Sequence, residues 1–290
     1  MILIADSGST KTYWSLLKGS SESFHYKTSG INPFFESELQ IETHLRKQLL
    51  QQMHVEEINA IYFFGAGCAT EKQKQVMINA FEKVFRFQKI VVESDLLGAA
   101  KALCGDQQGI VCILGTGSNS GFYDGEKIVK QVAPLGYIIG DEGSGAALGK
   151  KLVADCLKNQ LSPTIQERFF NRFSLSQAEI VENIYTKPFP SRFLASLSIF
   201  LHENLDEPEL YQLVYDSFTD FFKRNVFQYD YQHYKVQIVG SIGYYYQHVL
   251  RHVATDLSID LGEIAQAPME KLILYYQPQN ALLEPTRYGI

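Results

Sequence analysis

The chain repeats one pattern twice: an apolar strand that ends in a turn of glycines and hydroxyl-bearing residues. Residues 2–10 form the first copy and residues 111–119 form the second. Later in each half a continuous apolar run, 61–64 and 236–239, ends in another glycine-containing turn. Such runs are typical of strands that are buried on both faces. A repeat of this length predicts two domains with the same fold.

Other patterns place further elements around these strands. Each half is expected to begin with a β-meander, which turns at Lys18-Gly19-Ser20 in the first half and at a two-residue hairpin, Asp124-Gly125, in the second. The other expected strands are residues 12–17, 24–27, 89–93, 120–123 and 127–132, and the expected helices are 38–52, 96–103 and a set within 145–227.

The length of 290 residues also favours two domains, because a single core usually divides near this size. A boundary at Gly105-Asp106 gives domains of residues 1–106 and 107–269. The segment 268–283 is expected to be a last strand or helix. Whether residues 270–290 pack back onto the first domain stays open.

Composition limits the partners of this chain. The net charge is −6 and no basic patch stands out, so nucleic acid is not an expected partner. The cysteines at 68, 104, 112 and 156 show no CxxC spacing, which favours buried, inert thiols. The first apolar run lacks a basic flank, and no run approaches the roughly 18 residues that span a bilayer. A soluble, cytoplasmic protein without a membrane partner is therefore expected.

The two glycine-rich turns have the chemistry of phosphate sites. Small residues allow close approach to an anion, and backbone N–H groups and hydroxyls supply donors. The turns are Asp6-Ser7-Gly8-Ser9-Thr10-Lys11-Thr12 and Gly115-Thr116-Gly117-Ser118-Asn119. Neither is a P-loop, and neither opens a helix as a dinucleotide fingerprint does. The alternative for each is a plain tight hairpin turn.

Asp6 has no acidic counterpart in the second copy, where Gly115 stands instead. A carboxylate beside phosphate would repel it unless a cation lay between them. Mg²⁺ prefers one or two carboxylates together with water and phosphate oxygens. We therefore expect Asp6 to anchor Mg²⁺, most simply through water; the alternative is an Asp that caps its own turn.

The order of motifs along the chain resembles a known family. The two turns above are joined by Gly65-Ala66-Gly67, Ser94-Asp95, Gly140-Asp141-Glu142-Gly143-Ser144 and Val239-Gly240-Ser241-Ile242-Gly243. Together they resemble the N-acetylglucosamine kinase branch of the BadF/BadG/BcrA/BcrD-type ATPases, within the superfamily of acetate kinase, sugar kinases, Hsp70 and actin. The resemblance covers nearly the whole chain.

This resemblance implies an α/β fold of two RNase H-like (actin-like ATPase) domains. Each would be a mixed five-stranded sheet flanked by helices, and ATP would bind in an interdomain cleft. The residues implied to bind ATP are Ser7, Gly8, Ser9, Thr10, Lys11 and Thr12 for one phosphate motif, Gly115, Thr116, Gly117 and Ser118 for the other, and Gly240, Ser241 and Gly243 for adenosine. A homodimer is also common in such kinases.

The same resemblance implies the sugar-binding residues. Asn32 and Asp95 would bind the sugar, and Asp141 would lie near it. The chain departs from the family pattern after Asn32, where Pro33-Phe34-Phe35 replaces a more polar stretch with Trp.

Two acidic positions carry the expected chemistry. Asp95 follows the expected strand 89–93 and could take the proton from an attacking hydroxyl, and by resemblance it is the catalytic base. Its alternative is an N-cap for the next helix. Asp141 is expected to orient sugar hydroxyls, and its alternative is a solvated helix N-terminus; Glu142 has no assigned role.

The expected function is ATP-dependent phosphorylation of an amino sugar, N-acetylglucosamine to its 6-phosphate, with ATP and Mg²⁺ as cofactors. Glucosamine and N-acetylmuramic acid stay open as acceptors. Two other functions also stay open. One is an ATPase activator of a radical dehydratase, which needs paired cysteines near the nucleotide, and the other is a non-catalytic sugar or nucleotide sensor.

Overall fold

The computed structural model describes residues 1–19, 22–53 and 58–282, so Ser20 of the first expected turn and residues 283–290 lie outside the described residues. The chain divides into two compact units. Unit 1 contains residues 1–107, 125–127 and the segment from Pro268 onward, and unit 2 contains residues 108–124 and 128–267.

Unit 1 is built on a mixed five-stranded sheet in the order β3-β2-β1-β4-β5. Its strands are β1 (Ile2–Ser7), β2 (Lys11–Lys18), β3 (Glu22–Ser29), β4 (Ile58–Gly65) and β5 (Phe87–Ser94). β1 runs antiparallel to β2 and parallel to β4, which is parallel to β5. The carboxyl ends of β1, β4 and β5 therefore meet at one edge of the sheet.

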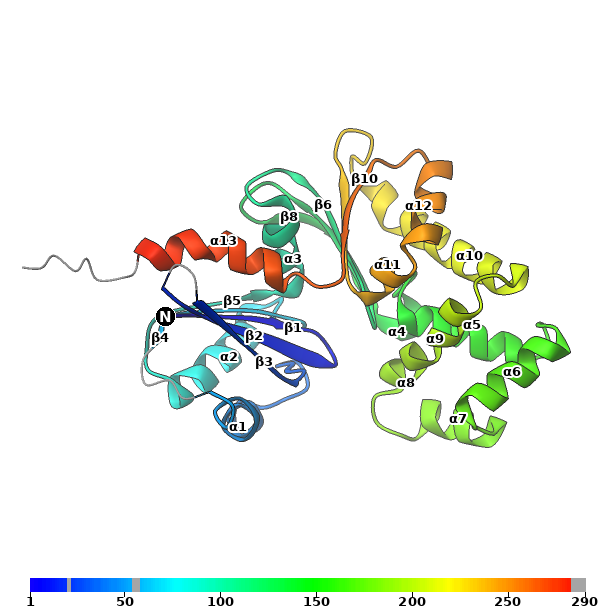
Figure 1. Cartoon of the computed structure of the whole chain (residues 1–290), viewed down its shortest axis with the longest axis horizontal. Helices are drawn as coiled ribbons and strands as arrows, with labels where there is room; N and C mark the ends of the chain where they lie inside the picture. The colour runs from blue at the N-terminus through cyan, green and yellow to red at the C-terminus, as the bar shows by residue number, and fades with distance from the viewer. Residues whose placement is uncertain (20–21, 54–57, 283–290) are drawn as a thin grey trace, which may run out of the picture. The chain divides into compact units, whose positions relative to one another are not determined.

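Alternate side chains of β1 face two different layers of unit 1. Leu3 and Ala5 pack into the core beneath α1 and α2, whereas Ile2 and Ile4 pack beside Leu272 of α13. This alternation is the two-residue period of a strand buried on both faces. Figure 1 shows α13 on one side of the sheet, with α1 and α2 on the other. The helices of unit 1 are α1 (Glu38–His44), α2 (Glu71–Val84), α3 (Asp95–Cys104) and α13 (Met269–Leu282).

Two expectations for unit 1 need refinement. The helix expected over 38–52 is an α-helix only to His44, after which a π-helical segment, η1 (Leu45–Leu49), follows. The last strand or helix expected over 268–283 is a helix, α13 (Met269–Leu282), and it contacts β1, β2 and α3.

Unit 2 has a second mixed five-stranded sheet, in the order β10-β9-β6-β7-β8. Its strands are β6 (Gly109–Leu114), β7 (Ser118–Tyr123), β8 (Ile128–Val132), β9 (Val236–Val239) and β10 (Leu261–Ala265). In the reverse direction this order is β8-β7-β6-β9-β10, which corresponds strand for strand to β3-β2-β1-β4-β5 of unit 1. This correspondence confirms the repeated fold. β10 was not expected, because its short run contains Gly262 and Glu263 and its side chains are mostly half-buried or exposed.

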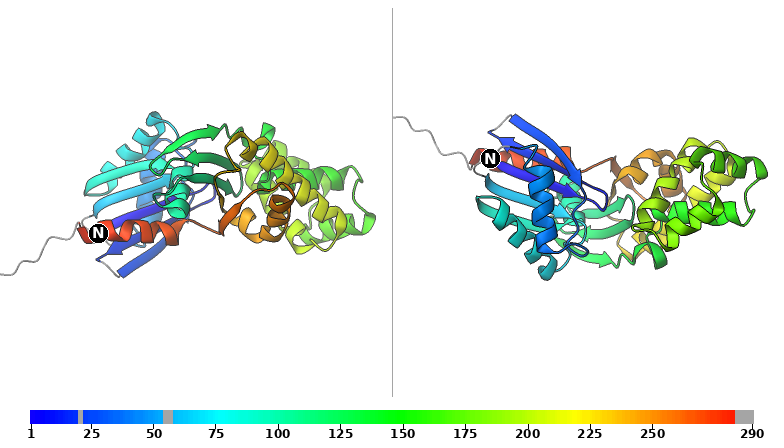
Figure 2. Two further views of the ribbon diagram at one scale, coloured as in Figure 1. Left: turned by 90° about the horizontal axis from the view of Figure 1, so that it is seen from above. Right: turned by 90° about the horizontal axis from the view of Figure 1, so that it is seen from below.

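A large helical insertion between β8 and β9 supplies most of the core of unit 2. Both views in Figure 2 show these green and yellow helices gathered into one mass beside the sheet. The helices of unit 2 are α4 (Gly136–Ile139), α5 (Gly145–Leu157), α6 (Pro163–Phe173), α7 (Gln177–Tyr185), α8 (Pro190–Leu197), α9 (Ile199–Glu203), α10 (Pro208–Arg224), the 3₁₀ segment η2 (Val226–Gln228), α11 (Ser241–Tyr245) and α12 (Gln247–Asp256). No helix among the described residues combines the length and the hydropathy that crossing a bilayer requires.

The prediction of a two-residue hairpin turn at Asp124-Gly125 is wrong. β7 ends at Tyr123 and β8 begins at Ile128, and the pairing register shifts between Phe122 and Tyr123. Gly125 adopts a φ of +104°, and a Cβ there would lie 2.7 Å from the carbonyl oxygen of Asp106. The loop is therefore longer than a tight turn because it packs against the end of unit 1's first segment.

Candidate active site

The first glycine-rich turn closes the β1–β2 hairpin. The Gly8 N–H donates to the Lys11 carbonyl at 3.0 Å, and the side chains of Ser9, Thr10 and Lys11 are exposed. Gly30 packs directly beneath the turn, since a Cβ at Gly30 would lie 2.4 Å from the carbonyl oxygen of Gly8. The turn therefore presents small residues and backbone at the carboxyl end of β1.

Two hydroxyls of this hairpin are used inside the fold. Ser7 and Thr12 are fully buried, and their hydroxyl oxygens lie 2.7 Å apart. The Ser7 hydroxyl donates to the Ile31 carbonyl at 3.0 Å and accepts from the Ile31 N–H at 3.1 Å. Thr12 donates to the Ser29 carbonyl at 3.1 Å. These hydroxyls tie the hairpin to the last residue of β3 and to Ile31 just after it, so they are used within the fold.

Asp6 and Asp95 lie at the same edge of the sheet. Asp6 pairs in register with Phe64 of β4, and Gly65 of β4 pairs with Ser94, just before Asp95. Burial and the charge of Asp95 raise the pKa of Asp6 to about 7. Burial raises the pKa of Asp95 to about 6, although hydrogen bonding to backbone N–H groups acts in the opposite direction. Two carboxyl groups that disfavour simultaneous ionisation are typical of catalytic and cation-binding sites.

Helix α3 is capped by Ser94 and not by Asp95. The Ser94 hydroxyl accepts from the Leu97 N–H at 3.3 Å, which is the usual N-cap bond. Asp95 is the first residue of the helix, and its Oδ1 accepts from the Leu96 N–H at 2.9 Å. The capping role considered for Asp95 is therefore filled by its neighbour.

Asn32 is held near the end of β4. Its side-chain Oδ1 accepts from the Phe34 backbone N–H at 2.9 Å, and its backbone N–H donates to the Glu36 carboxylate at 2.8 Å. Gly67 has a φ of +82°, and a Cβ there would lie 2.0 Å from the Asn32 Oδ1. Phe34 and Phe35 are exposed. Unit 1 thus brings together its turn, its two acids and Asn32, while Gly67 and Glu36 are supports that the sequence reading did not identify.

The second glycine-rich turn lies against the start of helix α5. The Gly115 N–H donates to the Gly117 carbonyl at 3.0 Å and closes the turn. The Gly145 and Ala146 N–H groups donate to the Gly115 and Thr116 carbonyls at 2.9 and 3.0 Å. The first N–H groups of a helix have no partner within the helix, so these bonds join the turn rigidly to α5.

Asp141 contacts this second turn directly. Its Oδ1 accepts from the Ser118 N–H at 3.3 Å, and a Cβ at Gly117 would lie 2.9 Å from its Oδ2. Asp141 has a φ of +58°, which is uncommon for a residue other than glycine, and burial raises its pKa. Ser144 caps α5 through a 3.1 Å bond from the Ala147 N–H, so Asp141 is not part of a solvated helix end.

The turn after β9 packs beside the same strand end. Gly240 has a φ of +122°, and a Cβ there would lie 2.3 Å from the Leu114 carbonyl oxygen. A Cβ at Gly243 would lie 2.5 Å from Ile238 and 3.6 Å from the Leu114 side chain. Ser241 is the first residue of α11. Unit 2 therefore brings residues 115–118, Asp141 and residues 240–243 to one region.

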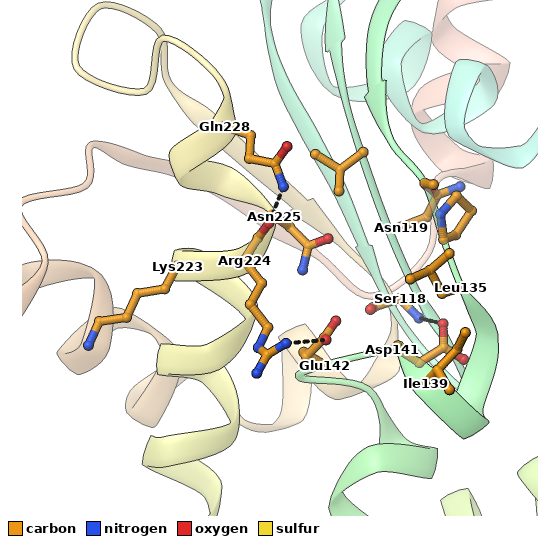
Figure 3. A pocket seen from close by; sticks show the side chains of 14 residues that line it. Ser118, Asn119, Leu135, Ile139, Asp141, Glu142, Lys223, Arg224, Asn225 and Gln228 are labelled. Carbon is orange, nitrogen blue, oxygen red and sulfur yellow. Dashed lines mark hydrogen bonds and ion pairs between the residues drawn. The ribbon is translucent and has the colours of Figure 1, made fainter.

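A cavity of about 430 Å³ opens beside Asp141 in unit 2. Figure 3 shows it between the end of α10 and the chain that carries Ser118 and Asn119. Glu142 forms an ion pair of 3.8 Å with Arg224 across it. The sequence offered no signal for Arg224, because α10 is separated from Glu142 by most of the helical insertion.

The cysteines do not form a ligand cluster. Cys68, Cys112 and Cys156 are buried and Cys104 is half-buried. Burial raises the pKa of Cys104 to about 11 and that of Cys68 and Cys156 to about 12, and it also raises the pKa of Cys112. Within the described ranges, no three His, Cys, Asp or Glu side chains gather in a way that could hold a metal ion. These thiols stay protonated at neutral pH.

Comparison with solved structures shows relatives that match nearly the whole chain. A candidate N-acetylglucosamine kinase from Porphyromonas gingivalis is 44% identical in sequence, covers 96% of this chain and 99% of its own, and superposes with a TM-score of 0.91. A second candidate N-acetylglucosamine kinase, from Chromobacterium violaceum, is 19% identical over 94% of this chain and 98% of its own, with a TM-score of 0.72. At that identity the second likeness shows the fold alone.

Sequence comparison adds one curated relative. The N-acetylmuramic acid/N-acetylglucosamine kinase of Clostridium acetobutylicum is 29% identical over 149 residues, which cover 50% of this chain and 49% of that protein. The match thus spans about half the length of the curated relative. No family model matches the chain.

Proposed function

Because the chain belongs to the family of N-acetylglucosamine kinases with the actin-like ATPase fold, we propose that it transfers the γ-phosphate of ATP to the 6-hydroxyl of N-acetylglucosamine. The observation that carries this proposal is the 44% identity to the Porphyromonas gingivalis protein over nearly the full length of both chains.

The two hairpin turns supply the donors for the phosphates of ATP. The backbone of residues 8–11 and of residues 115–118 carries small residues at strand ends, a pattern suited to anions. The second turn also lies on the N-terminal end of α5, where the helix dipole favours negative charge. The glycine turn 240–243 packs beside it and suits contact with the adenosine.

Asp95 acts as the general base in this proposal. Its pKa of about 6 leaves it ionised at neutral pH while keeping it basic enough to accept a proton. As the sugar oxygen attacks the γ-phosphorus, its proton passes to the Asp95 carboxylate and ADP leaves. Phosphoryl transfer needs positioning and charge stabilisation more than covalent catalysis, so one well-placed base suffices.

Asp6 fits a magnesium ion. Its carboxyl group is partly buried, and burial and the charge of Asp95 raise its pKa to about 7. A cation bound beside it would stabilise the ionised carboxylate and so lower this pKa. Mg²⁺ takes one or two carboxylates with waters and phosphate oxygens, so a full protein cage is not required. When bound, the ion would neutralise the developing negative charge on the phosphates.

Asn32 and Asp141 hold the acceptor. Both side chains are fixed by hydrogen bonds within their own unit, Asn32 through Phe34 and Asp141 through Ser118. A preorganised amide and a preorganised carboxylate can orient hydroxyl groups without losing further side-chain freedom on binding.

An ADP-release assay over a panel of sugars tests the proposal. The panel contains N-acetylglucosamine, glucosamine, N-acetylmuramic acid and glucose, with Mg²⁺ and ATP, and a reaction without sugar gives the background ATPase rate. We expect the largest kcat/KM with N-acetylglucosamine and a 6-phosphate as the product by ³¹P NMR. The background rate with every amino sugar, from protein that still binds ATP, would contradict the proposal.

A further inference from the structure

Residues 29–37, which we call the acceptor loop because they carry Asn32, are hydrogen-bonded along their whole length. Every backbone N–H group of this loop donates to a protein acceptor, and Pro33 has none to donate. Surface loops are usually more mobile than the helices and strands that they connect. The acceptor loop, between β3 and α1, is instead fixed by these bonds.

Glu36 is bonded to Asn32 in both directions. The Asn32 backbone N–H donates to the Glu36 Oε1 at 2.8 Å, and the Glu36 backbone N–H donates to the Asn32 carbonyl at 3.0 Å. The Asn32 side chain is fixed within the same loop, because its Oδ1 accepts from the Phe34 N–H at 2.9 Å. The carboxylate of Glu36 therefore holds the backbone of the residue that the proposed function gives to the sugar.

His44 holds the other oxygen of the same carboxylate. The Glu36 Oε2 lies 3.6 Å from the His44 Nδ1, and the His44 Nε2 lies 3.0 Å from the Ser29 Oγ. The side chains of His44 and Glu36 are only 9% and 26% exposed, so water screens this contact less than it screens an ion pair on the surface. The imidazole thus connects Ser29, at the end of β3, with Glu36, just before α1.

The π-helical segment η1 holds the first residue of the acceptor loop a second time. The Gln48 Oε1 accepts from the Ser29 N–H at 2.9 Å and from the Ser29 hydroxyl at 3.0 Å. η1 follows directly on His44, and its characteristic bond runs from the Leu50 N–H to the Leu45 carbonyl at 3.0 Å. π-helical turns are rare and often lie at functional sites, which agrees with a role for this helix in holding the loop.

The side chains of Ser29, His44 and Glu36 follow one another as in the triads of hydrolases, but their contacts do not suit that chemistry. The Ser29 hydroxyl donates to Gln48, and the backbone N–H groups of residues 29–31 are all bonded within the protein. A hydrolase needs a nucleophile that donates to its base, and it needs free donors for the oxyanion. The cluster is therefore better explained as a support than as a second active site.

We propose that Glu36 and His44 are positioning residues, which act through Asn32 to set the affinity of unit 1 for the acceptor sugar. The inference rests on the proposed kinase function and adds two residues to it. When the carboxylate or the imidazole is removed, Asn32 populates other conformations, and the apparent affinity for the sugar falls with the fraction that stays competent. Once the sugar is bound, Asn32 is again in its productive conformation, so the rate of phosphoryl transfer is retained.

The first experiment replaces Glu36 in two ways. Glu36→Ala removes the acceptor of the Asn32 N–H, and we expect it to raise the KM for N-acetylglucosamine about tenfold, the scale of one lost hydrogen bond. The kcat and the KM for ATP should stay within about twofold. Glu36→Gln retains an oxygen that accepts from Asn32, so its KM for the sugar should stay within about threefold of the wild type.

The second experiment compares two histidines that each contact a serine of β3. His44 lies 3.0 Å from Ser29 at the end of the strand, and the His25 Nε2 lies 3.3 Å from the Ser23 Oγ near its start. We expect His44→Ala to raise the KM for N-acetylglucosamine about three- to fivefold, since it removes one support of the Glu36 carboxylate. His25→Ala is the matched control and should leave every kinetic constant within about twofold. This pair tests the inference even if Glu36→Ala does not fold.

A double-mutant cycle shows whether Glu36 acts through Asn32. In the Asn32→Ala background, Glu36→Ala should weaken sugar binding by less than about twofold, because the side chain that Glu36 positions is already absent. Effects that multiply would show that Glu36 only stabilises the fold, and would overturn the inference. Isothermal titration calorimetry measures each dissociation constant, and urea denaturation measures the stability of each variant.

These measurements distinguish the positioning role from the kinase activity. Sugar binding that depends on Glu36 and His44, without phosphorylation, supports the positioning role and overturns the proposed function. Phosphorylation of N-acetylglucosamine with an unchanged KM in Glu36→Ala and His44→Ala overturns the positioning role and leaves the function intact. A lower kcat at an unchanged KM would place these residues in the chemical step and would also overturn the inference.

Discussion

The two glycine-rich hairpins share one topology but use their side chains differently. In the first hairpin, the buried hydroxyls of Ser7 and Thr12 bond the backbone at the end of β3 and just after it, and two acids, Asp6 and Asp95, lie at the strand ends. In the second, the turn is bonded to the start of α5, and the Thr116 hydroxyl makes no hydrogen bond within the described residues. The comparison teaches that a duplicated fold can keep its strand order while each copy fixes its turn by different contacts, buried hydroxyls in one and a helix start in the other.

The largest expected effect concerns the acid of unit 1. Asp95→Asn should lower kcat about a hundredfold or more, the scale of a lost general base, while the affinity for ATP is retained. Asp141→Asn, in unit 2, should act mainly on the KM for the sugar. Steady-state kinetics together with ATP titration calorimetry measure both. A kcat that is unchanged in Asp95→Asn would remove the chemical difference between the two units.

The next effect tests the buried hydroxyl of the first hairpin. Ser7→Ala removes one hydroxyl that both donates to and accepts from Ile31, and leaves those buried backbone groups without partners. We expect it to lower the free energy of unfolding by about 2–3 kcal/mol in urea denaturation. Thr116→Ala, at the aligned position, should cost less than about 0.5 kcal/mol. Equal losses would show that the two hairpins are supported alike.

A third effect concerns pH and Asp6. Its pKa in the folded protein, about 7, lies above the value of 3.8 for an unperturbed aspartate. The folded state therefore binds this proton more tightly than the unfolded state does. The stabilisation that comes from the bound proton is complete below pH 4 and is lost as the pH rises through 7.

We expect the unfolding free energy of the wild type to fall by on the order of 4 kcal/mol between pH 4 and pH 8 through this group, in the absence of divalent cations. Asp6→Asn should show a flatter dependence of unfolding free energy on pH over the same range. Urea denaturation at several pH values measures it, and parallel curves for the two proteins would contradict the role of the acid pair.

The smallest expected effect comes from replacing one glycine in each turn. A Cβ at Gly117 would lie 2.9 Å from the Asp141 carboxylate, whereas a Cβ at Gly8 would meet only the Lys11 carbonyl at 3.8 Å. Gly117→Ala should raise the dissociation constant for N-acetylglucosamine about tenfold without nucleotide, since it would displace the Asp141 carboxylate that we propose to orient the sugar. Gly8→Ala should leave that constant unchanged under the same conditions.

The central strands β1, β4, β6 and β9 could be read from the sequence because their apolar runs are continuous, and the repeat then predicted two sheets of one topology. The supports of the site could not be read in the same way. The bond between Ser7 and Ile31 joins residues on different elements, and the place of Asn32 depends on Gly67 having no side chain. The contact between Asp141 and Ser118 depends on a left-handed backbone at a non-glycine residue, which no local pattern indicates.

Strand β10 and the loop 124–127 were missed for a related reason. Both are short, and their sequences are polar enough to resemble turns. Their structure depends on neighbours that arrive from elsewhere in the chain, as Asp106 does at Gly125. Local propensity is a weak guide wherever tertiary contacts decide the conformation.

Helix α13 has a consequence for how the protein is made. It is the last helix of the described residues, yet Leu272 and Tyr276 complete the apolar layer over Ile2, Ile4 and Tyr62. During synthesis the first strands leave the ribosome long before this cover exists. One face of the sheet of unit 1 must stay without its helix until residues 269–282 have been made, so a nascent or prematurely terminated chain would present an exposed apolar surface to chaperones and to other copies of itself.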